Sequence, residues 1–554
     1  MEKKKMAVYS IVALVALALL VVGATYAYFQ NQYGSASNAD VKVTTYTTDV
    51  LTFETGSNIS ITAGQDDFAS GKGNKTGSTF ARATLQANNK TNTATANYYM
   101  YLNIENNTFT YTNTSTPELL LQVVEKTSGN PVTSITGLDY VTVTDGKNTS
   151  ISGFDITTKK GLIALFSNKE ISASPKTVEE YTITITLVNH NFDQNVNTGK
   201  ILNGKLIIQK EKIITSVSDV AKNGDNLVTA IQNLSTKSKP SLTGLYHHDS
   251  NLTNGAGDNS YRFAGADPNN YVCFGSDDTT CPTENLYRII GVIDGKVKLI
   301  HAYGATTDML GTDEGYAKTY QEAWGSLSSY GSLSSYYKGN GDLTKIGSYK
   351  WNKINGNTWS ASTTNTINLN KNFLAYLDGK NTKWKTLITD TTWYVGGMTY
   401  NNGEGTNAKT AYDYEVGANK DATTTVNAKI GLMYVSEYYY AATPDYWTLP
   451  GVDQNGHPNE AGTAWIGEDY SKAYNDNWLY TGLDEWTISR ASGPPIFAFG
   501  VPCLGVPNGY DVDDAIGVAV RPSFSLSSSI KFTSGEGTAV NPIRINLWLG
   551  IMHV

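Results

Sequence analysis

The stretch Leu286–Ile300, LYRIIGVIDGKVKLI, decides how the second half of this chain folds. Two apolar runs, Tyr287–Ile293 and Lys296–Ile300, flank Asp294-Gly295. Asp and Gly both tolerate a positive φ, so an Asp-Gly pair between apolar runs is the usual signature of a tight β-hairpin. The sequence therefore predicts two antiparallel strands near the start of this half.

Tryptophan divides the chain into two parts. All ten Trp lie between Trp324 and Trp548, and the stretch from Gln30 to about Lys239 has none. A chain of 554 residues can form two or three domains, each with its own core. We therefore expect two separate cores, with an all-β sandwich over residues 29–213 and a second domain over 242–554.

The first part is a succession of short alternating runs. In Tyr181–Leu187, YTITITL, apolar side chains alternate with threonines, which is the period of a half-buried strand. Similar runs occur at Tyr98–Ile104, Leu119–Val124, Tyr140–Val143, Leu162–Phe166 and Ile201–Gln209. Turn residues separate these runs, and the pattern predicts a sandwich of short antiparallel strands.

A short helical segment follows the last of these strands. Val220, Leu227, Ala230, Ile231 and Leu234 recur at helical spacing, and the polar run STKSKP comes after them. We expect a short helix and a linker over residues 214–241.

The N-terminus has the pattern of a secretory leader. Lys3, Lys4 and Lys5 precede an uncharged stretch from Met6 to Ala24, about the length that spans a bilayer core. Residues 1–28 are expected to be a signal peptide or a membrane anchor, with residues 6–27 in the cytoplasmic membrane. The protein would be held at the cell membrane with extracellular domains, or secreted after cleavage near Ala27.

The junction ATYAYF, residues 24–29, resembles that of camelysin-type and biofilm-matrix fibre proteins of Gram-positive bacteria. Those proteins are processed by a dedicated signal peptidase, so the resemblance implies cleavage.

Charge and composition limit the possible partners. The net charge is −8 and only 17% of the residues are charged. Nucleic-acid binding needs a concentrated basic face, so no nucleic-acid partner is expected. A composition rich in Thr, Asn, Ser, Gly and Tyr suits an exported β-rich protein.

The three cysteines are Cys273, Cys281 and Cys503. The segment between the first two, FGSDDTT, favours a tight loop, and export makes oxidation possible. We expect a Cys273–Cys281 disulfide, which would leave Cys503 outside it. The alternative is two thiols, one of them buried.

The motifs of catalysis are missing from the sequence. It contains no Gly-x-Ser-x-Gly elbow, P-loop or dinucleotide fingerprint. Only His247 and His248 of the six histidines are close together, and neighbours along a chain rarely bind one metal ion. The carboxylate pair Asp484-Glu485 is expected to be a solvated loop. We expect neither an enzyme nor a cofactor nor a bound metal.

The segments YRFAGADPNNYVCFGSD, LYRIIGVIDGKVKLI, IGLMYVSEY, NWLY, EWTIS and VAVRPSFSL follow one another in the second part. In this order they resemble an extracellular domain of gut Gram-positive bacteria that is similar to the C-type-lectin-like fold of the formylglycine-generating-enzyme superfamily. The resemblance implies a mixed α+β, C-type-lectin-like domain over residues 242–554, with long loops that carry function. Those enzymes work through paired cysteines near the C-terminal end, whereas Cys503 has no neighbour there, which speaks against their chemistry.

The segment Ala491–Pro522 is the candidate binding region. Its Pro and Gly content predicts irregular structure through Pro494–Pro507. Its apolar side chains either return to the core or form a binding patch. The candidate ligand-binding residues are Phe497, Val501, Leu504, Val506, Asn508, Tyr510, Asp511 and Asp513. In retroelement-diversified proteins of the resembled fold, the variable segment has this place. Like a product of adenine-directed mutagenesis, Ala491–Pro522 lacks Lys, Glu, Gln, Met and Trp.

These observations predict a cell-surface or secreted binding protein that displays its second domain on a β-sandwich spacer. The ligand is expected to be an extracellular glycan or protein. Two alternatives remain: a fibre-forming matrix component that polymerises through strand edges, and an enzyme of unknown type.

Overall fold

The computed structural model describes residues 49–68, 72–88, 92–113, 116–324, 337–339, 341–399, 406–448, 471–493, 495–503 and 505–547. The chain divides into two compact units at Ile213/Ile214. None of the helices in these ranges has both the length and the apolar character that a membrane span requires. The expected leader and the cleavage position at Ala27 lie outside the described residues.

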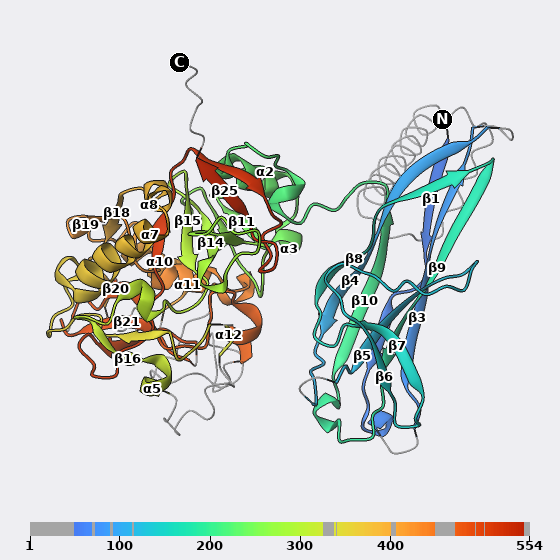
Figure 1. Ribbon diagram of the computed structural model, residues 1–554, viewed down its shortest axis with the longest axis horizontal. Coiled ribbons are helices and arrows are strands. Elements are labelled where there is room, and N and C mark those ends of the chain that lie inside the picture. The colour runs from blue at the N-terminus through green and yellow to red at the C-terminus, as the bar shows by residue number, and fades with distance from the viewer. Residues whose placement is uncertain are drawn as a thin grey trace, which may run out of the picture. The chain divides into compact units, whose positions relative to one another are not determined.

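The first unit is built from two antiparallel sheets (Figure 1). The larger has the order β1-β3-β9-β5-β7-β6 and the smaller β2-β10-β4-β8. The strands are β1 (Val50–Thr55), β2 (Ile59–Thr62), β3 (Lys75–Gln86), β4 (Ala94–Asn107), β5 (Leu119–Glu125), β6 (Tyr140–Thr144), β7 (Ser150–Asp155), β8 (Gly161–Ala173), β9 (Lys176–Leu187) and β10 (Ile201–Gln209). Short 3₁₀ turns lie at Gln65–Phe68 and Asn195–Asn197.

The core of the first unit follows from the alternation of its strands. Tyr181, Ile183 and Ile185 of β9 are buried, and so are Met100 and Leu102 of β4 in the other sheet. One cluster of buried side chains joins the two sheets, as in a sandwich. Each of the six runs that the sequence singles out lies within an observed strand.

The second unit has a central antiparallel sheet of the order β11-β12-β14-β15-β23, with β13 paired to β14. Its strands are β11 (Leu245–His248), β12 (Ser260–Phe263), β13 (Tyr271–Cys273), β14 (Leu286–Ile293), β15 (Lys296–His301) and β23 (Ser523–Ser525). Smaller sheets contain β16 (Tyr316–Thr319), β17 (Gly347–Tyr349), β18 (Thr391–Tyr394), β19 (Thr425–Ala428), β20 (Glu485–Arg490), β21 (Phe497–Val501), β22 (Asn508–Asp511), β24 (Ile530–Ser534) and β25 (Arg544–Leu547).

Short helices surround these sheets (Figure 1). They are α2 (Leu227–Lys237), α3 (Pro240–Thr243), α4 (Thr307–Leu310), α5 (Tyr320–Trp324), α7 (Leu374–Lys380), α8 (Thr382–Leu387), α10 (Ala408–Glu415), α11 (Val435–Tyr440) and α12 (Ser471–Asp476), with a π-helix over Thr364–Phe373. Further 3₁₀ turns lie at Val217–Asp219, Thr283–Asn285, Trp359–Ala361 and Pro444–Tyr446.

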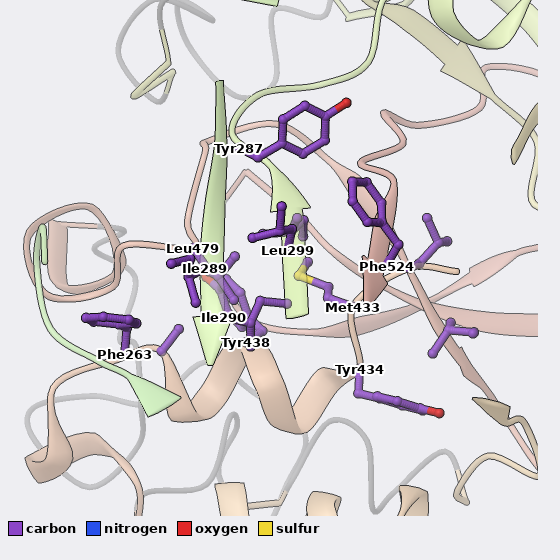
Figure 2. Close-up of a cluster of buried hydrophobic side chains, with 14 of the residues drawn as sticks. Phe263, Tyr287, Ile289, Ile290, Leu299, Met433, Tyr434, Tyr438, Leu479 and Phe524 are labelled. Atoms are coloured by element: carbon purple, nitrogen blue, oxygen red, sulfur yellow. The ribbon is translucent and has the colours of Figure 1, made fainter. Parts of the chain in front are cut away.

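The hairpin predicted from Leu286–Ile300 is confirmed. Asp294 and Gly295 have φ angles of 50° and 70°, and β14 pairs with β15 on either side of them. On its other side β15 pairs with β23, so that Leu299 lies opposite Phe524. Figure 2 shows these side chains in one cluster with Tyr438 of α11. The centre of the second unit thus depends on residues far apart in the sequence.

Tryptophan side chains fix the connections to this core. Trp486 Nε1 donates to the Tyr349 carbonyl at 2.8 Å, and Trp478 Nε1 donates to the Phe263 carbonyl at 2.8 Å. A buried indole nitrogen needs such a partner, because an unmet donor in the core costs free energy. Each indole therefore holds its loop to the core through a hydrogen bond as well as through its buried apolar surface.

The helix expected within residues 214–241 is present as α2, but it belongs to the second unit. Its N-cap is Asn226, whose side chain accepts from Thr229 N. Leu227, Ile231 and Leu234 are buried in the core of that unit. An apolar helix face must be covered, so this segment is part of a domain and not only a linker.

Candidate functional site

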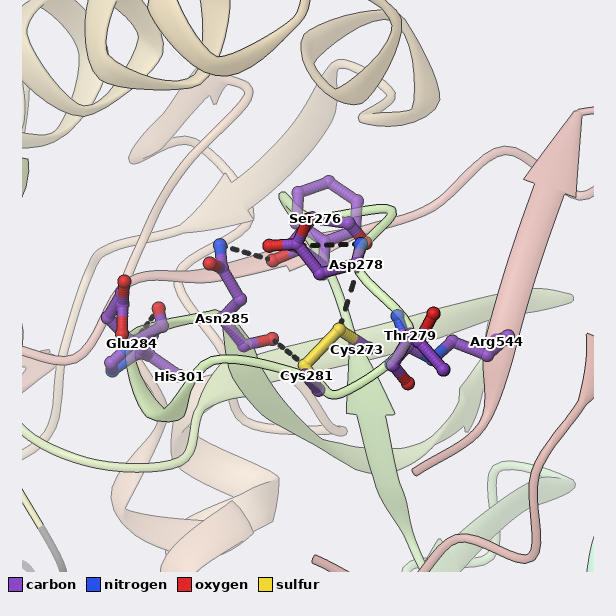
Figure 3. The surroundings of a disulfide bond; sticks show 10 residues. Cys273, Ser276, Asp278, Thr279, Cys281, Glu284, Asn285, His301 and Arg544 are labelled. Atoms are coloured by element: carbon purple, nitrogen blue, oxygen red, sulfur yellow. Dashed lines mark hydrogen bonds between the residues drawn. A yellow bond between two sulfur atoms is a disulfide. The ribbon is translucent and has the colours of Figure 1, made fainter. Parts of the chain in front are cut away.

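A disulfide closes a short loop at the end of β13. Cys273 and Cys281 are joined with an S–S distance of 2.02 Å and a Cα–Cα distance of 5.8 Å (Figure 3). Inside the loop, the Phe274 carbonyl accepts from Asn285 Nδ2 at 3.0 Å. The loop is therefore held both covalently and by the chain that leads into β14. Cys503 is buried and takes no part in the bond.

A cavity of about 390 Å³ opens beside this bond. Three chain segments line it: the disulfide loop, the start of α8, and the hairpin of β24 and β25. The lining residues are Cys273, Ser276, Asp277, Asp278, Thr279, Lys383, Trp384, Thr533, Ser534, Arg544, Ile545 and Asn546. A concave site of this size is in the range that small ligands occupy.

Two cationic and two carboxylate side chains lie around the cavity. Lys383 Nζ forms an ion pair with Asp277. Asp278 accepts a hydrogen bond from Ser276 Oγ at 2.9 Å, and Arg544 Nη2 donates to the Thr279 carbonyl at 2.9 Å (Figure 3). Among the described residues, no ionic group of opposite sign lies within 4.0 Å of the charged groups of Asp278 or Arg544. Within the part of the chain that the structure describes, Arg544 and Asp278 therefore have no ionic partner.

The aromatic ring in the lining faces the protein interior. Trp384 is only 3% exposed, and its ring packs against the ring of Phe274 at 5.1 Å between centroids. Lys383 Nζ lies 4.5 Å from the same indole. The ring therefore supports the wall but offers no open face on which a ligand could stack. The cavity wall combines apolar surface with four charged side chains, those of Asp277, Asp278, Lys383 and Arg544.

The region expected to be irregular, Pro494–Pro507, contains a strand, and that prediction is wrong. Residues Phe497–Val501 form β21, which pairs with β20 on one side and β22 on the other. The prolines bound the strand, with Pro495 before it and Pro502 after it. At Gly500 a Cβ would lie 2.9 Å from the Glu485 carbonyl, so glycine allows the close approach of β20.

The structure does not gather the sequence-predicted ligand-binding residues on one surface. Val501 and Val506 are buried, and Phe497 packs against the core. Tyr510 is half-buried, and Leu504 lies outside the described residues. Asn508 and Asp511 are exposed and Asp513 is half-exposed. None of the seven that the structure describes lines the cavity. For the exposed members, a role in binding stays a prediction.

The carboxylates Asp484 and Glu485 are buried, so the prediction of a solvated loop is wrong. Their exposed fractions are 5% and 1%. Asp484 accepts from Tyr510 Oη at 2.7 Å and from Tyr320 Oη at 3.3 Å. Burial raises the pKa of Asp484, and these hydrogen bonds act in the opposite direction. Alternation in EWTIS places Glu485 on the face opposite Trp486, but both faces of β20 are buried, which the local sequence did not indicate.

A further carboxylate that the sequence analysis missed is Glu415, at the end of α10. It is buried, and it accepts from Val435 N and Ser436 N, each at 2.9 Å, and from Ser489 Oγ. Burial raises the pKa of Glu415 to about 7. Both oxygens are used to hold the start of α11, which makes Glu415 a structural group.

His247 and His248 have different surroundings. His247 stacks on Tyr261, while His248 is buried and its Nδ1 accepts from Ala256 N at 3.0 Å. Over the described part of the chain, no group of three or more His, Cys, Asp or Glu side chains could hold a metal ion.

Comparisons with known proteins leave the site to be interpreted from its own geometry. The chain matches no protein-family model, and searches of curated proteins and of solved structures gave no match.

Proposed function

We propose that this chain is an exported binding protein whose second unit captures a polar extracellular ligand in the cavity beside Cys273–Cys281. One observation carries the proposal: a disulfide-closed loop supplies Ser276, Asp277, Asp278 and Thr279 to the wall of that cavity. The bond fits an oxidising compartment. The concave polar wall fits recognition of a small polar group.

Export is supported by the N-terminal sequence as well. The lysine-led apolar stretch up to Ala24 would direct the chain across the cytoplasmic membrane, either as an anchor or as a leader cleaved near Ala27. The low content of charged residues, 17%, agrees with a protein that works outside the cell. The first unit then serves as a spacer between the cell and the binding unit.

We further propose that the second unit is a C-type-lectin-like domain. Its support is a small central sheet with long connections, and the order of the motifs from YRFAGADPNNYVCFGSD to VAVRPSFSL. In such an architecture loops carry the binding residues while the sheet holds them in place. The disulfide loop supplies Ser276–Thr279 to the cavity in this way, while β13, β24, β25 and α8 form the rest of its wall.

Location and binding are tested separately. Protease added to intact Gram-positive cells that produce the full-length chain should degrade it, while a cytoplasmic marker survives. The full-length protein in detergent is then applied to glycan and extracellular-protein arrays. We expect a ligand whose binding falls at least tenfold in Cys273→Ser. Cys503→Ala is the matched control, because it leaves the bridge intact. Protection from protease on intact cells, or binding unchanged in Cys273→Ser, would contradict the proposal.

A second candidate function is a fibre-forming matrix component. Its support is β8, a strand of 13 residues at one edge of the smaller sheet of the first unit. An edge strand of this length presents unpaired backbone groups to a neighbouring chain. Filaments of the purified protein in electron micrographs would favour this function, and a monomer at high concentration would oppose it.

A further inference from the structure

We propose that the cavity beside the Cys273–Cys281 bond binds a free α-amino acid in its zwitterionic form. This inference rests on the proposed function, because it names the ligand class of the same site. It depends on two opposite charges, those of Arg544 and Asp278, which face one cavity without pairing to each other.

Arg544 is suited to hold the carboxylate of such a ligand. It lies at the start of β25, where its Nη2 donates to the Thr279 carbonyl at 2.9 Å. A guanidinium has five N–H donors in a planar fork, which matches the two oxygens of a carboxylate. The bond to Thr279 uses one donor and fixes the group at the cavity wall.

Asp278 is suited to hold the ammonium group. It is exposed in the cavity wall and is oriented by Ser276 Oγ at 2.9 Å, while its own backbone N–H donates back to that hydroxyl at 3.1 Å. A carboxylate with one donor bound retains capacity to accept from an ammonium ion.

The placement of the two charges fits a ligand whose carboxylate and ammonium groups are attached to the same carbon atom. Arg544 donates a hydrogen bond to the carbonyl of Thr279, the residue next to Asp278. The guanidinium and the Asp278 carboxylate therefore lie beside the same short segment of the chain. Their charged atoms are nevertheless more than 4.0 Å apart. In the proposed complex, the carboxylate of the α-amino acid lies on Arg544 and its ammonium group on Asp278.

The charge balance of the lining opposes a ligand with a net charge. Lys383 and Arg544 contribute two positive charges, and Asp277 and Asp278 contribute two negative charges. A simple anion or cation would gain from one pair and lose to the other. A neutral sugar would use the hydroxyl groups, but the covered ring of Trp384 gives it no face on which to stack.

Titration calorimetry on the full-length protein in detergent, at low salt, tests the ligand class. The probes are L-alanine, N-acetyl-L-alanine, L-alaninamide and glucose. L-Alanine should bind, and blocking either charge should weaken binding at least tenfold. Equal affinity for the blocked compounds, binding of glucose in preference to L-alanine, or no heat with L-alanine would overturn the inference.

Variants locate the site. Arg544→Gln and Asp278→Asn should each weaken L-alanine binding at least tenfold, while Arg82→Gln in the first unit and the exposed Asp390→Asn should leave it unchanged. Asp278 makes only local hydrogen bonds, so its variant tests the site even where Arg544→Gln folds poorly. If array ligands still bind and depend on Arg544 but L-alanine does not, the proposed function stands and this inference fails. If neither binds, both fail.

Discussion

The guanidinium of Arg521 and the carboxylate of Glu485 form a buried ion pair with two hydrogen bonds at the centre of the second unit. Nη2 donates to Oε1 at 2.9 Å, and Nε donates to Oε2. Nη2 of Arg521 also donates to the Leu479 carbonyl at 2.8 Å. Arg521 precedes β23 and Glu485 begins β20, so the pair joins the central sheet to the three-stranded sheet.

Removing one partner of this ion pair should lower the free energy of unfolding of the second unit. Glu485→Gln leaves the Arg521 charge enclosed without a counter-ion, and breaking a buried pair in this way costs about 3–5 kcal/mol. All ten Trp lie beyond residue 320, so indole fluorescence during urea unfolding reports the second unit alone. The matched control is Glu314→Gln in the exposed pair with Lys353, where about 1 kcal/mol or less is expected. Similar losses in both variants would contradict the assignment.

The disulfide should stabilise the second unit as well as shape the cavity. The bonded residues are eight positions apart, and closing so short a loop removes about 2–3 kcal/mol of chain entropy from the unfolded state. The double variant Cys273→Ser/Cys281→Ser should lose about that amount in urea unfolding. Wild-type protein treated with a reducing agent should match the variant. An unfolding midpoint that neither change shifts would show that the bond adds no stability.

Local patterns predicted six strands of the first unit and the central hairpin of the second, because each of these depends on neighbours in the sequence. The turn at Asp294-Gly295 and the alternation in Tyr181–Leu187 are of this kind. The sequence did not predict the strand β21, because the Pro and Gly residues in and around it are typical of a loop. The role of Gly500 depends on its partner strand β20, because a Cβ at this position would lie too close to the Glu485 carbonyl.

The cavity could not be predicted for a related reason. Its charged residues come from three distant places in the sequence, represented by Asp278, Lys383 and Arg544. The Cys273–Cys281 spacing indicated a closed loop, but nothing local tells which segments come to lie against it. The buried Asp484 and Glu485 are similar, since their partners Tyr510 and Arg521 follow only after the intervening strands.

Glu415 predicts a pH dependence of stability. Its pKa is raised from an ordinary 4.5 to about 7 by burial. A raised carboxylate pKa means that the folded state favours the protonated form. The contribution of Glu415 to the free energy of unfolding is therefore complete below pH 4.5 and is lost as the pH rises through about 7. We expect the unfolding free energy of the second unit to fall by about 3 kcal/mol between these values from this group.

The variant Glu415→Gln isolates that contribution. Asp484 and Glu485 also have pKa values raised by burial, so only the difference in slope between wild type and variant is assigned to Glu415. Urea unfolding from pH 4.5 to 8 should show a flatter profile in Glu415→Gln than in the wild type. Parallel profiles for wild type and Glu415→Gln would contradict the prediction.

The hydroxyl of Tyr510 should contribute to stability through Asp484. Tyr510→Phe keeps the ring but removes the 2.7 Å bond to Asp484 Oδ1, which leaves a buried carboxylate with one fewer donor. The expected cost is about 1–3 kcal/mol. Tyr394→Phe in β18 is the comparison, because the hydrogen bonds between Tyr394 and Tyr434 use the backbone N–H and carbonyl of Tyr394. A smaller loss at Tyr510 than at Tyr394 would be inconsistent with the hydrogen bond.

Two glycines should respond in opposite directions to the same substitution. At Gly291 in β14 a Cβ would lie 2.2 Å from the Tyr261 carbonyl, a backbone atom that can move only with its strand. Gly291→Ala should therefore cost about 1–3 kcal/mol or more. At Gly379 in α7 a Cβ would meet nothing within 4 Å, so Gly379→Ala should add up to about 1 kcal/mol through helix propensity. Urea unfolding followed by indole fluorescence measures both, and equal shifts of the same sign would refute the close contact of β12 with β14.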